Sequence, residues 1–353
     1  MTDTIDSREG LLETVSRYRT QIMGFAAMWI FFFHVRNESV VFKNIPVLSN
    51  IDTFFVNIGF CGVDIFLFLS GWGLYHAVNR HSLTVFYKRR YRRLIIPFLV
   101  SCTFLAINYK WGFLRIIKAV TCWTFLTKDV YEVIWFIPAI SILYLAFPLY
   151  RRLFDKASCK YVFTAAAVAL WSALAVAGAL LFDRTDIYLF LNRIPVFIVG
   201  ILFGWMTYGG KKRLGRFAWI ILAVMLIAGF QIQYYFSFEK VSFLLPQGRN
   251  GLPAFLIGIA MCFVAGLVFK LLGKVTFIQK AYGFLGKMTL EFYAAQDIAI
   301  RLLKEMIVHS GVPFNNYLYV LLTFLLSFGI AYLLYLINRL ISKKMDKEAL
   351  FTG

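Results

Sequence analysis

Long apolar stretches separated by short polar ones run through almost the whole chain of 353 residues. A helix that crosses a bilayer needs about 20 mostly apolar residues, and ten stretches meet this condition. They lie approximately at 21–41, 54–77, 94–110, 132–150, 161–182, 188–208, 217–237, 251–272, 284–308 and 317–340. Most lack the strict alternation of barrel strands, and helices satisfy their own backbone hydrogen bonds in lipid. The pattern predicts an all-α, polytopic integral membrane helical bundle of about ten transmembrane helices, forming a single domain over residues 1–353.

A shorter apolar stretch, residues 111–127, contains Arg115 and Lys118. Its length and its two charges argue against a full crossing of the membrane. We therefore expect an interfacial or re-entrant helix in this segment.

The distribution of positive charge predicts the orientation in the membrane. If the N-terminus is cytoplasmic, the cytoplasmic segments hold 25 of the 37 Lys and Arg residues and the opposite segments hold 11, with Arg193 inside a span. Cytoplasmic loops carry such an excess in membrane proteins. We predict a multi-pass protein of the cell (inner, cytoplasmic) membrane with both termini cytoplasmic, in which residues 1–20 and 342–353 form the two cytoplasmic ends.

Composition agrees with a membrane protein and narrows its partners. The chain is 60% hydrophobic and only 16% charged, whereas soluble domains are about 45–50% apolar and 25% charged. The net charge of +19 would suggest nucleic acid in a soluble protein, but here it follows from the orientation rule. We expect contact with membrane lipid and no nucleic-acid partner. The five scattered cysteines show neither metal-site spacing nor a disulfide framework, so we expect no metal.

His34 is an ionisable residue inside the first predicted span. Ionisable groups at membrane depth are costly and mark functional sites. Counting the rise of the first two predicted helices puts Asp64 at a depth comparable with His34. A carboxylate beside an imidazole fixes one tautomer and raises the basicity of the other nitrogen, as a general base requires. We predict His34 and Asp64 as the catalytic pair; the alternative is that both satisfy nearby backbone groups, Asp64 at a break near Gly62.

A run of five cations precedes the third span, and they are Lys88, Arg89, Arg90, Arg92 and Arg93. Such a cluster can neutralise a multiply phosphorylated ligand, because guanidinium forks match phosphate geometry. The same run is also typical of membrane anchoring with contact to anionic lipid. Spacing by itself favours the anchoring interpretation.

Further charged residues lie inside the later spans. Arg193 is in the sixth span and Glu291 in the ninth, where charged groups pair with one another or with a ligand. Asp297 and Arg301 are four residues apart on one predicted helix and can satisfy each other. Glu291 has no such neighbour, which makes Arg193 a candidate partner. Trp135, at the start of the fourth span, is by itself typical of an interfacial aromatic residue.

Together these segments resemble acyltransferase family 3, a family of bacterial integral-membrane O-acyltransferases. The family has a Gly-Val-Asp and Leu-Ser-Gly-aromatic motif in its second span, an Arg-x-x-Arg before a proline, a Trp-Phe and a Tyr-x-x-x-Pro in its fourth span, and two later conserved segments. The matching positions are Gly62, Val63, Asp64, Phe66, Leu69, Ser70, Gly71, Trp72, Arg90, Arg93, Pro97, Trp135, Phe136, Tyr144, Pro148 and the segments 193–200 and 285–293. The resemblance extends from residue 19 to about residue 300.

The resemblance implies transfer of an acyl group, usually acetyl from acetyl-coenzyme A, to a hydroxyl of a cell-surface or exported glycan. It implies that His34 is the essential base and that the basic run holds coenzyme A. The acyl-coenzyme A is then a donor substrate, and no permanently bound cofactor is expected. Substrate-binding candidates are Ser70, Trp135, Arg193 and Glu291, of which Ser70 and Arg193 could stabilise the oxyanion.

The chain departs from the family at two positions. Met23 stands where the family often has an arginine, and Gln296 where many members have a histidine. Arg17 or Arg19 could supply the missing charge.

A transporter or flippase is the rival function. It would use His34, Asp64, Arg193 and Glu291 as a proton or substrate relay, and composition and topology allow it. The cytoplasmic cations together with a base at membrane depth favour the enzyme.

Overall fold

The computed structural model describes residues 10–35, 44–78, 82–126, 135–181, 189–208, 214–215, 217–238, 251–310 and 316–351. Every regular element within these ranges is a helix, which confirms the predicted all-α bundle. Eight helical segments of this part of the chain are long and apolar enough to cross a membrane. They are Pro46–Val78, Leu83–Asn108, Phe136–Lys156, Lys160–Gly178, Leu189–Thr207, Phe217–Phe236, Gly251–Lys274 and Tyr317–Ser342.

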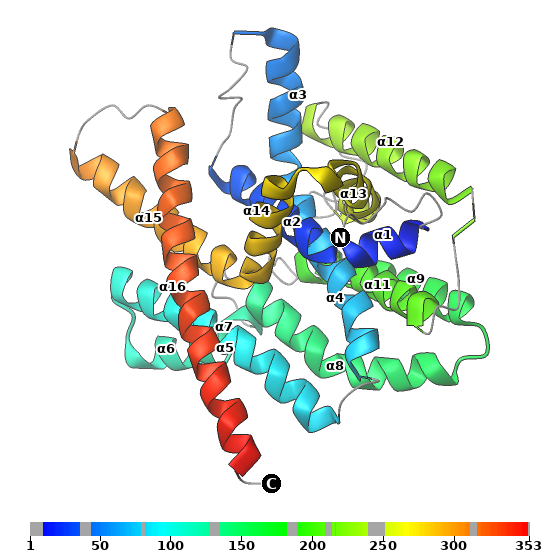
Figure 1. Ribbon diagram of the computed structural model, residues 1–353, viewed down its shortest axis with the longest axis horizontal. Coiled ribbons are helices and arrows are strands. Elements are labelled where there is room, and N and C mark those ends of the chain that lie inside the picture. The colour runs from blue at the N-terminus through cyan, green and yellow to red at the C-terminus, as the bar shows by residue number, and fades with distance from the viewer. Residues whose placement is uncertain are drawn as a thin grey trace.

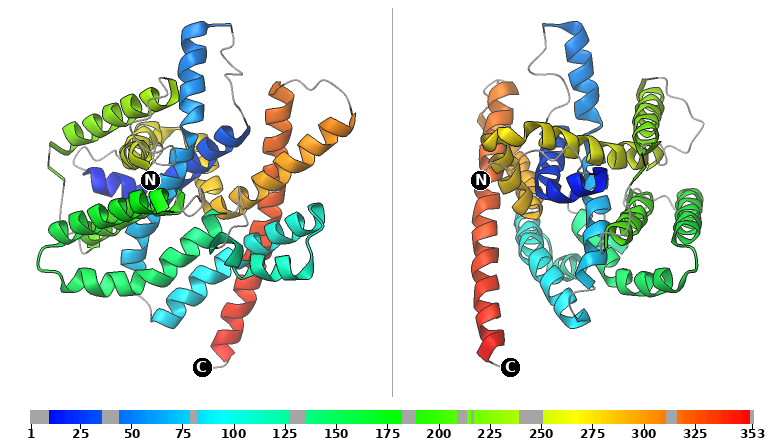
Figure 2. Two further views of the ribbon diagram at one scale, coloured as in Figure 1. Left: turned by 180° about the vertical axis from the view of Figure 1, so that it is seen from behind. Right: turned by 45° about the vertical axis from the view of Figure 1, so that its right-hand side comes forward.

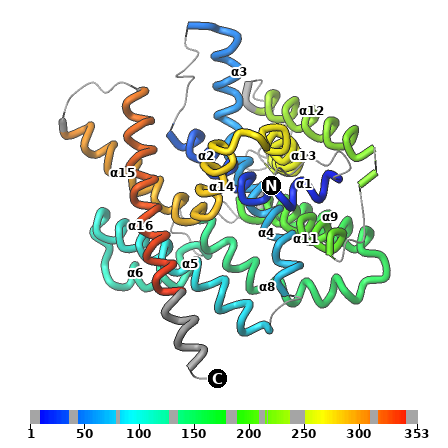
Figure 3. The backbone as a smooth tube through the Cα atoms, in the orientation of Figure 1, coloured from blue at the N-terminus to red at the C-terminus, as the bar shows by residue number. Residues whose placement is uncertain are grey.

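The helices form one bundle in which α2 and α4 lie near the middle (Figure 1). The α-helices are α1 (Leu11–Arg17), α2 (Arg19–Val35), α3 (Pro46–Asn57), α4 (Gly62–Val78), α5 (Leu83–Asn108), α6 (Phe113–Val120), α7 (Trp123–Leu126), α8 (Phe136–Lys156), α9 (Lys160–Leu181), α11 (Ile194–Thr207), α12 (Phe217–Phe238), α13 (Gly251–Leu271), α14 (Thr276–Lys287), α15 (Thr289–Ser310) and α16 (Asn316–Phe351). Helices α15 and α16 pack together on one side, whereas α9, α11 and α12 lie on the opposite side (Figures 1 and 3). The backbone view thus places the centre of the bundle between these two groups.

Two of the ten predicted spans are not among the eight segments. The first, 21–41, corresponds to α2, whose described helix has 17 residues; residues 36–41 lie outside the described ranges, as do 1–9 of the predicted cytoplasmic N-terminal segment and 352–353 of the tail. The ninth, 284–308, corresponds mainly to α15, a helix of 22 residues that carries Glu291, Asp297, Arg301, Lys304 and Glu305. Helix α15 is therefore long enough to span but less apolar than the others.

In the structure the second span starts earlier than the sequence pattern predicted. Helix α3 begins at Pro46 and projects from one end of the molecule (Figure 2). A short 3₁₀ turn at Gly59–Cys61 then joins it to α4. Proline is favoured in the first turn of a helix, where its missing N–H is not needed. The 12 residues of α3 therefore lengthen this segment and shift the level of every residue in α4.

The described part of segment 111–127, residues 111–126, forms two short helices, α6 and α7, rather than a span. Cys122 lies between them with a positive φ of 60°, a conformation that ends a regular helix. Phe113 and Leu114 are exposed at 78% and 66%. As predicted, this segment does not form a single helix long enough to cross the membrane.

Helices α4 and α11 touch through glycines. A Cβ at Gly71 would overlap the carbonyl oxygen of Phe197, and a Cβ at Gly200 would overlap that of Phe68. Small residues allow such close backbone approach between membrane helices. This contact fixes α4, which carries several candidate site residues, against α11.

We expect the substitution Gly200→Ala to destabilise the protein, because the added methyl group has no space against the Phe68 carbonyl. Overpacking of this kind costs about 1–3 kcal/mol. The matched control is Gly329→Ala in α16, where a Cβ would meet nothing within 4 Å. Thermal unfolding in detergent should show a lower Tm for Gly200→Ala alone, and equal Tm values for the two variants would contradict the packing described.

Candidate functional site

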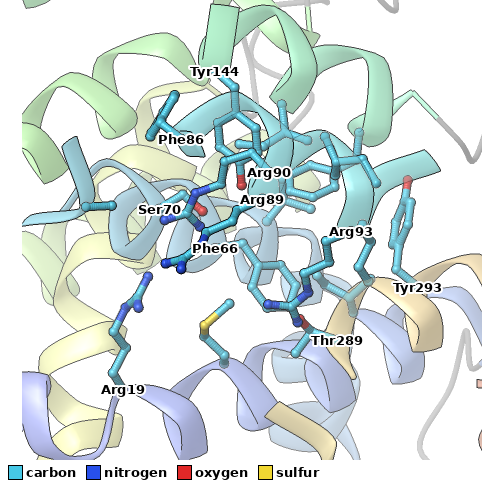
Figure 4. A pocket seen from close by; sticks show the side chains of 18 residues that line it. Arg19, Phe66, Ser70, Phe86, Arg89, Arg90, Arg93, Tyr144, Thr289 and Tyr293 are labelled. Carbon is cyan, nitrogen blue, oxygen red and sulfur yellow. The ribbon is translucent and has the colours of Figure 1, made fainter. Parts of the chain in front are cut away.

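A cavity of about 390 Å³ opens between α2, α4, α5, α8 and α15. Four arginines line it, Arg19 from the start of α2 and Arg89, Arg90 and Arg93 from α5. Their side chains converge on the same space (Figure 4). No acidic residue is among the lining residues in the described part of the chain. The cavity is therefore strongly positive and suits an anionic ligand.

Neutral groups contact three of the four arginines. Arg19 donates from Nη2 to the carbonyl oxygen of Leu69 at 2.8 Å, and Arg93 donates from Nη2 to that of Lys287 at 2.9 Å. The Arg90 guanidinium lies 5.8 Å from the centre of the Tyr144 ring. These contacts orient the guanidinium groups of Arg19, Arg90 and Arg93 toward the cavity.

Helical periodicity explains which cations of the basic run reach the cavity. Helix α5 starts after Ser82, whose Oγ accepts a hydrogen bond from the N–H of Val85 at 3.4 Å. Positions 89, 90 and 93 then share one face, because residues three and four apart are neighbours on a helix. Arg92 instead extends toward α16, where Nη1 donates to the carbonyl oxygen of Ser342 at 3.5 Å. Lys88 is exposed, so neither Lys88 nor Arg92 lines the cavity.

The remaining wall combines hydroxyl groups with apolar side chains. Ser70 of α4 and Tyr144 of α8 lie near the arginines (Figure 4). Ile30 of α2 and Tyr293 of α15 also line the cavity. Because Ile30 is eleven residues along α2 from Arg19, or about 16 Å of helical rise, the cavity extends a long way into the bundle.

His34 is not a lining residue of this cavity, but it lies just beyond the deep end. It follows Ile30 by four residues on α2, or one helical turn of about 6 Å. The side chain of Gln296 lies beside the imidazole, and Gln296 follows Tyr293 by three residues on α15. His34 Nδ1 and Gln296 Oε1 are buried polar atoms without a hydrogen-bond partner. The two helices that line the deep end therefore also carry His34 and its neighbour.

Asp64 forms an ion pair with Arg193 rather than contacting His34. Arg193 Nε lies 3.5 Å from Asp64 Oδ2, and the two side chains are only 3% and 2% exposed. The Arg193 guanidinium also lies 5.5 Å from the centre of the Trp135 ring. Among the described contacts, none joins Asp64 to His34. The predicted orientation of His34 by Asp64 is therefore not what the structure shows.

The depth of Asp64 in the bundle explains why it contacts Arg193 and not His34. A Cβ at Gly62 would lie 2.7 Å from the Ala26 carbonyl oxygen and from Ile30 Cγ1, so the start of α4 lies beside the middle of α2. Asp64 is then close to the level of Ala26, eight residues before His34, which corresponds to about 12 Å. The predicted equal depth is wrong because α3 displaces α4 along the bundle.

Glu291 has a different partner from the one predicted. Its Oε1 accepts a hydrogen bond from Asn338 Nδ2 of α16 at 3.0 Å, so the predicted pairing with Arg193 is wrong. The predicted pair of Asp297 and Arg301 is confirmed, with Arg301 Nε 2.8 Å from Asp297 Oδ1. Glu291 therefore faces α16.

Two neighbours of the site were not assigned from the sequence. Arg19, and not Arg17, lines the cavity, one turn before Met23 on the same face of α2. Gln296 is the neighbour of His34. The four-residue spacing of Arg19 and Met23 was a usable signal, but the contact of Gln296 depends on how α15 packs on α2.

Comparison with known proteins gives one family match. The model of a family described as an acyltransferase domain matches residues 22–336. No curated protein matches the chain, and no solved structure matches it. The match includes α4, α5, α8, α11 and α15, and thus nearly all of the cavity wall. The family model matches most of the chain, which forms membrane-type helices around an arginine-lined cavity. The chain therefore belongs to acyltransferase family 3.

Proposed function

We propose that this membrane acyltransferase moves an acyl group, in the first instance acetyl, from coenzyme A to a hydroxyl of a cell-surface or exported glycan. The observation that carries the proposal is the cavity itself. Four arginines line one end, and the other end approaches His34. A phosphorylated donor with a long flexible arm fits such a site, because its charge and its reactive thioester are far apart.

The donor phosphates bind to Arg19, Arg89, Arg90 and Arg93, which act as charge-assisted hydrogen-bond donors. The arm of the donor then follows the cavity past Phe66 toward Ile30. From Arg19 to His34 the rise of α2 is about 22 Å, and the arm carries the thioester across this distance. Ser70 lies near the arginine end, so it contacts the donor and not the reacting carbonyl.

His34 acts as the general base at the far end. It removes the proton of the acceptor hydroxyl, whose oxygen attacks the thioester carbonyl. The carbon–sulfur bond then breaks, the acyl group stays on the acceptor oxygen, and the thiolate of coenzyme A takes up the proton from His34. The imidazole is unchanged after the cycle, as base catalysis requires.

The side chain of Gln296 orients the imidazole in this scheme. An amide offers both a donor and an acceptor, so its oxygen can accept the N–H of one ring nitrogen. The other ring nitrogen then presents its lone pair to the acceptor hydroxyl. This assignment gives Gln296 the positioning role that the sequence predicted for Asp64.

The test of the function uses purified full-length protein with acetyl-coenzyme A and a membrane extract that supplies the acceptor. We expect protein-dependent release of free coenzyme A thiol, together with new O-acetyl groups detected by mass spectrometry of the glycan fraction. Absence of both, with uptake of a solute driven by a proton gradient in vesicles, would instead establish the transporter.

The double variant Arg90→Ala, Arg93→Ala is expected to raise the KM for acetyl-coenzyme A by about 10²–10⁴-fold. Each hydrogen bond to a charged group contributes about 1.5–3 kcal/mol, and two are lost. The matched control is Arg152→Ala, Arg339→Ala, which removes the same charge from two exposed positions outside the cavity. Equal KM values for both double variants would assign the basic run to membrane anchoring alone.

A further inference from the structure

Three aromatic side chains line the end of the cavity that approaches His34. They are Phe66 of α4, Phe136 of α8 and Tyr293 of α15. The centre of the Phe136 ring lies 6.2 Å from that of Phe66 and 5.6 Å from that of Tyr293. Three helices therefore contribute one ring each, and the Phe136 ring contacts both of the others. We call this part of the cavity the aromatic end.

The aromatic end and the arginines lie at different levels of the bundle. The Arg90 guanidinium lies 5.8 Å from the centre of the Tyr144 ring. Tyr144 follows Phe136 by eight residues on α8, which corresponds to about 12 Å of helical rise. On α4, Ser70 lies near the arginines (Figure 4) and follows Phe66 by one helical turn. A ligand bound to the arginines therefore reaches the aromatic end only through an extended arm.

The wall of the aromatic end is almost entirely hydrocarbon. Ile30 and Val63 complete it beside the three rings. A Cβ at Gly62, the neighbour of Val63, would lie 2.7 Å from Ile30 Cγ1, so both side chains belong to the same level. Only Tyr293 brings a polar side-chain atom to this group of five. Such a wall favours a hydrocarbon group over water, and it suits an acyl chain.

The Phe136 ring is fixed by its surroundings. Its contacts with Phe66 and Tyr293 are joined by one with the Trp135 ring, whose plane is perpendicular to it at 6.2 Å between centres. Trp135 lies in turn against the Arg193 guanidinium, 5.5 Å from the ring centre. The three rings of the aromatic end are all buried. Because close-packed interiors yield little to added volume, these rings form a firm wall.

The size of the cavity limits what the aromatic end can hold. The whole cavity measures about 390 Å³, at the low end of the 300–1,000 Å³ or so that drug-sized ligands occupy. The arm of an acyl-coenzyme A that runs from the arginines toward His34 takes up most of this space. Little room is then left beyond the thioester carbonyl.

We infer that the aromatic end is the acyl-binding site, and that its rings, above all Phe136, restrict the donor to short acyl groups such as acetyl. Gln296, which lies beside His34, follows Tyr293 by three residues on α15, so the thioester carbonyl has to lie at this end. The chain beyond the carbonyl then meets the rings. This inference rests on the proposed function and adds the residues that select the acyl chain.

The experiment compares acetyl-, butyryl- and hexanoyl-coenzyme A as donors for the purified full-length protein. The membrane extract supplies the acceptor, and release of free coenzyme A thiol is measured. One methylene group more or less in an apolar pocket changes kcat/KM by about 10–200-fold. Because butyryl has two more methylene groups than acetyl, we expect the wild-type kcat/KM to be at least about 10²-fold lower for butyryl than for acetyl. Hexanoyl should be transferred more slowly still.

Two variants enlarge the aromatic end from different helices. In Phe136→Leu, the ratio of kcat/KM for acetyl to that for butyryl should fall at least about tenfold. The fall should come from faster butyryl transfer, because the lost ring leaves space beside Phe66 and Tyr293. Phe66→Leu removes a ring from α4 and should lower the same ratio by a similar factor.

The matched control is Phe263→Leu in α13. Phe263 is buried against the rings of Phe68 and Phe203, and it is not among the described residues that line the cavity. Thermal unfolding in detergent checks that all three variants are folded. The acetyl-to-butyryl ratio of the control should equal that of the wild type. An equal fall of the ratio in the control would show a general loosening of the bundle and refute the inference.

The remaining outcomes separate this inference from the proposed function. Transfer of all three acyl groups by the wild type with the same kcat/KM would leave the acyltransferase in place and refute the restriction to short chains. An unchanged ratio in both Phe136→Leu and Phe66→Leu would also refute it. No transfer from any donor would refute the proposed function and this inference with it.

Discussion

Replacing His34 with alanine is expected to lower the rate of acetyl transfer by about 10²–10⁴-fold, the range that a general base contributes. The amount of protein in the membrane should stay unchanged. His34 Nδ1 has no hydrogen-bond partner, so the substitution removes no hydrogen bond of that atom. The measurement is kcat with saturating acetyl-coenzyme A, together with a blot of the membrane fraction.

The control for this prediction is His309→Ala, which removes an exposed histidine far along α15. Its kcat should equal that of the wild type. Residual activity of His34→Ala within threefold of the wild type would show that no base is needed at this position. The proposed mechanism would then have to be abandoned, although the family membership would not.

The cation cluster shows what the sequence can predict. The sequence alone did not show which of the five basic residues between 88 and 93 bind a ligand, but the helix places 89, 90 and 93 on one face. The helical repeat thus predicts that these three can act together, but which face of α5 meets the cavity depends on the packing of α5 against the other helices. The contribution of Arg19 could also be derived, because it precedes Met23 by one turn on the same helix.

Partners across the bundle could not be predicted in the same way. The pairing of Arg193 depends on the relative height of α4 and α11, and an error of one or two turns changes which residues meet. Helix α3 starts at Pro46 rather than near residue 54, and this shifted Asp64 away from His34 and toward Arg193. Hydropathy locates a span, but it does not fix the offset between two spans.

The substitution Asp64→Ala is expected to destabilise the protein by about 3–5 kcal/mol, the cost of leaving a buried charge without its partner. Arg193 would remain 3% exposed with its guanidinium against the Trp135 ring. Its donation to the carbonyl oxygen of Leu189 at 3.4 Å is neutral and cannot replace the carboxylate. The measurement is the free energy of unfolding in mixed detergent and denaturant.

A double variant separates a structural role of this pair from a catalytic one. Asp64→Ala, Arg193→Met removes both charges and keeps an apolar side chain against Trp135, so most of the lost stability should return. Asp155→Ala is the comparison, since Asp155 is 45% exposed and its partner Arg151 keeps a hydrogen bond to the carbonyl oxygen of Tyr75. Because solvent reaches the Asp155 carboxylate, we expect the loss of this pair to cost less than that of Asp64, about 1 kcal/mol.

The activity of the same double variant decides the role of Asp64. If the pair is structural, as its distance from His34 indicates, then acetyl transfer should recover together with stability. A stable double variant with less than one hundredth of the wild-type kcat would instead place Asp64 in the reaction itself. Stability and catalysis are thus measured on the same double variant. If stability returns while kcat stays low, then the Asp64 carboxylate acts on the reacting groups.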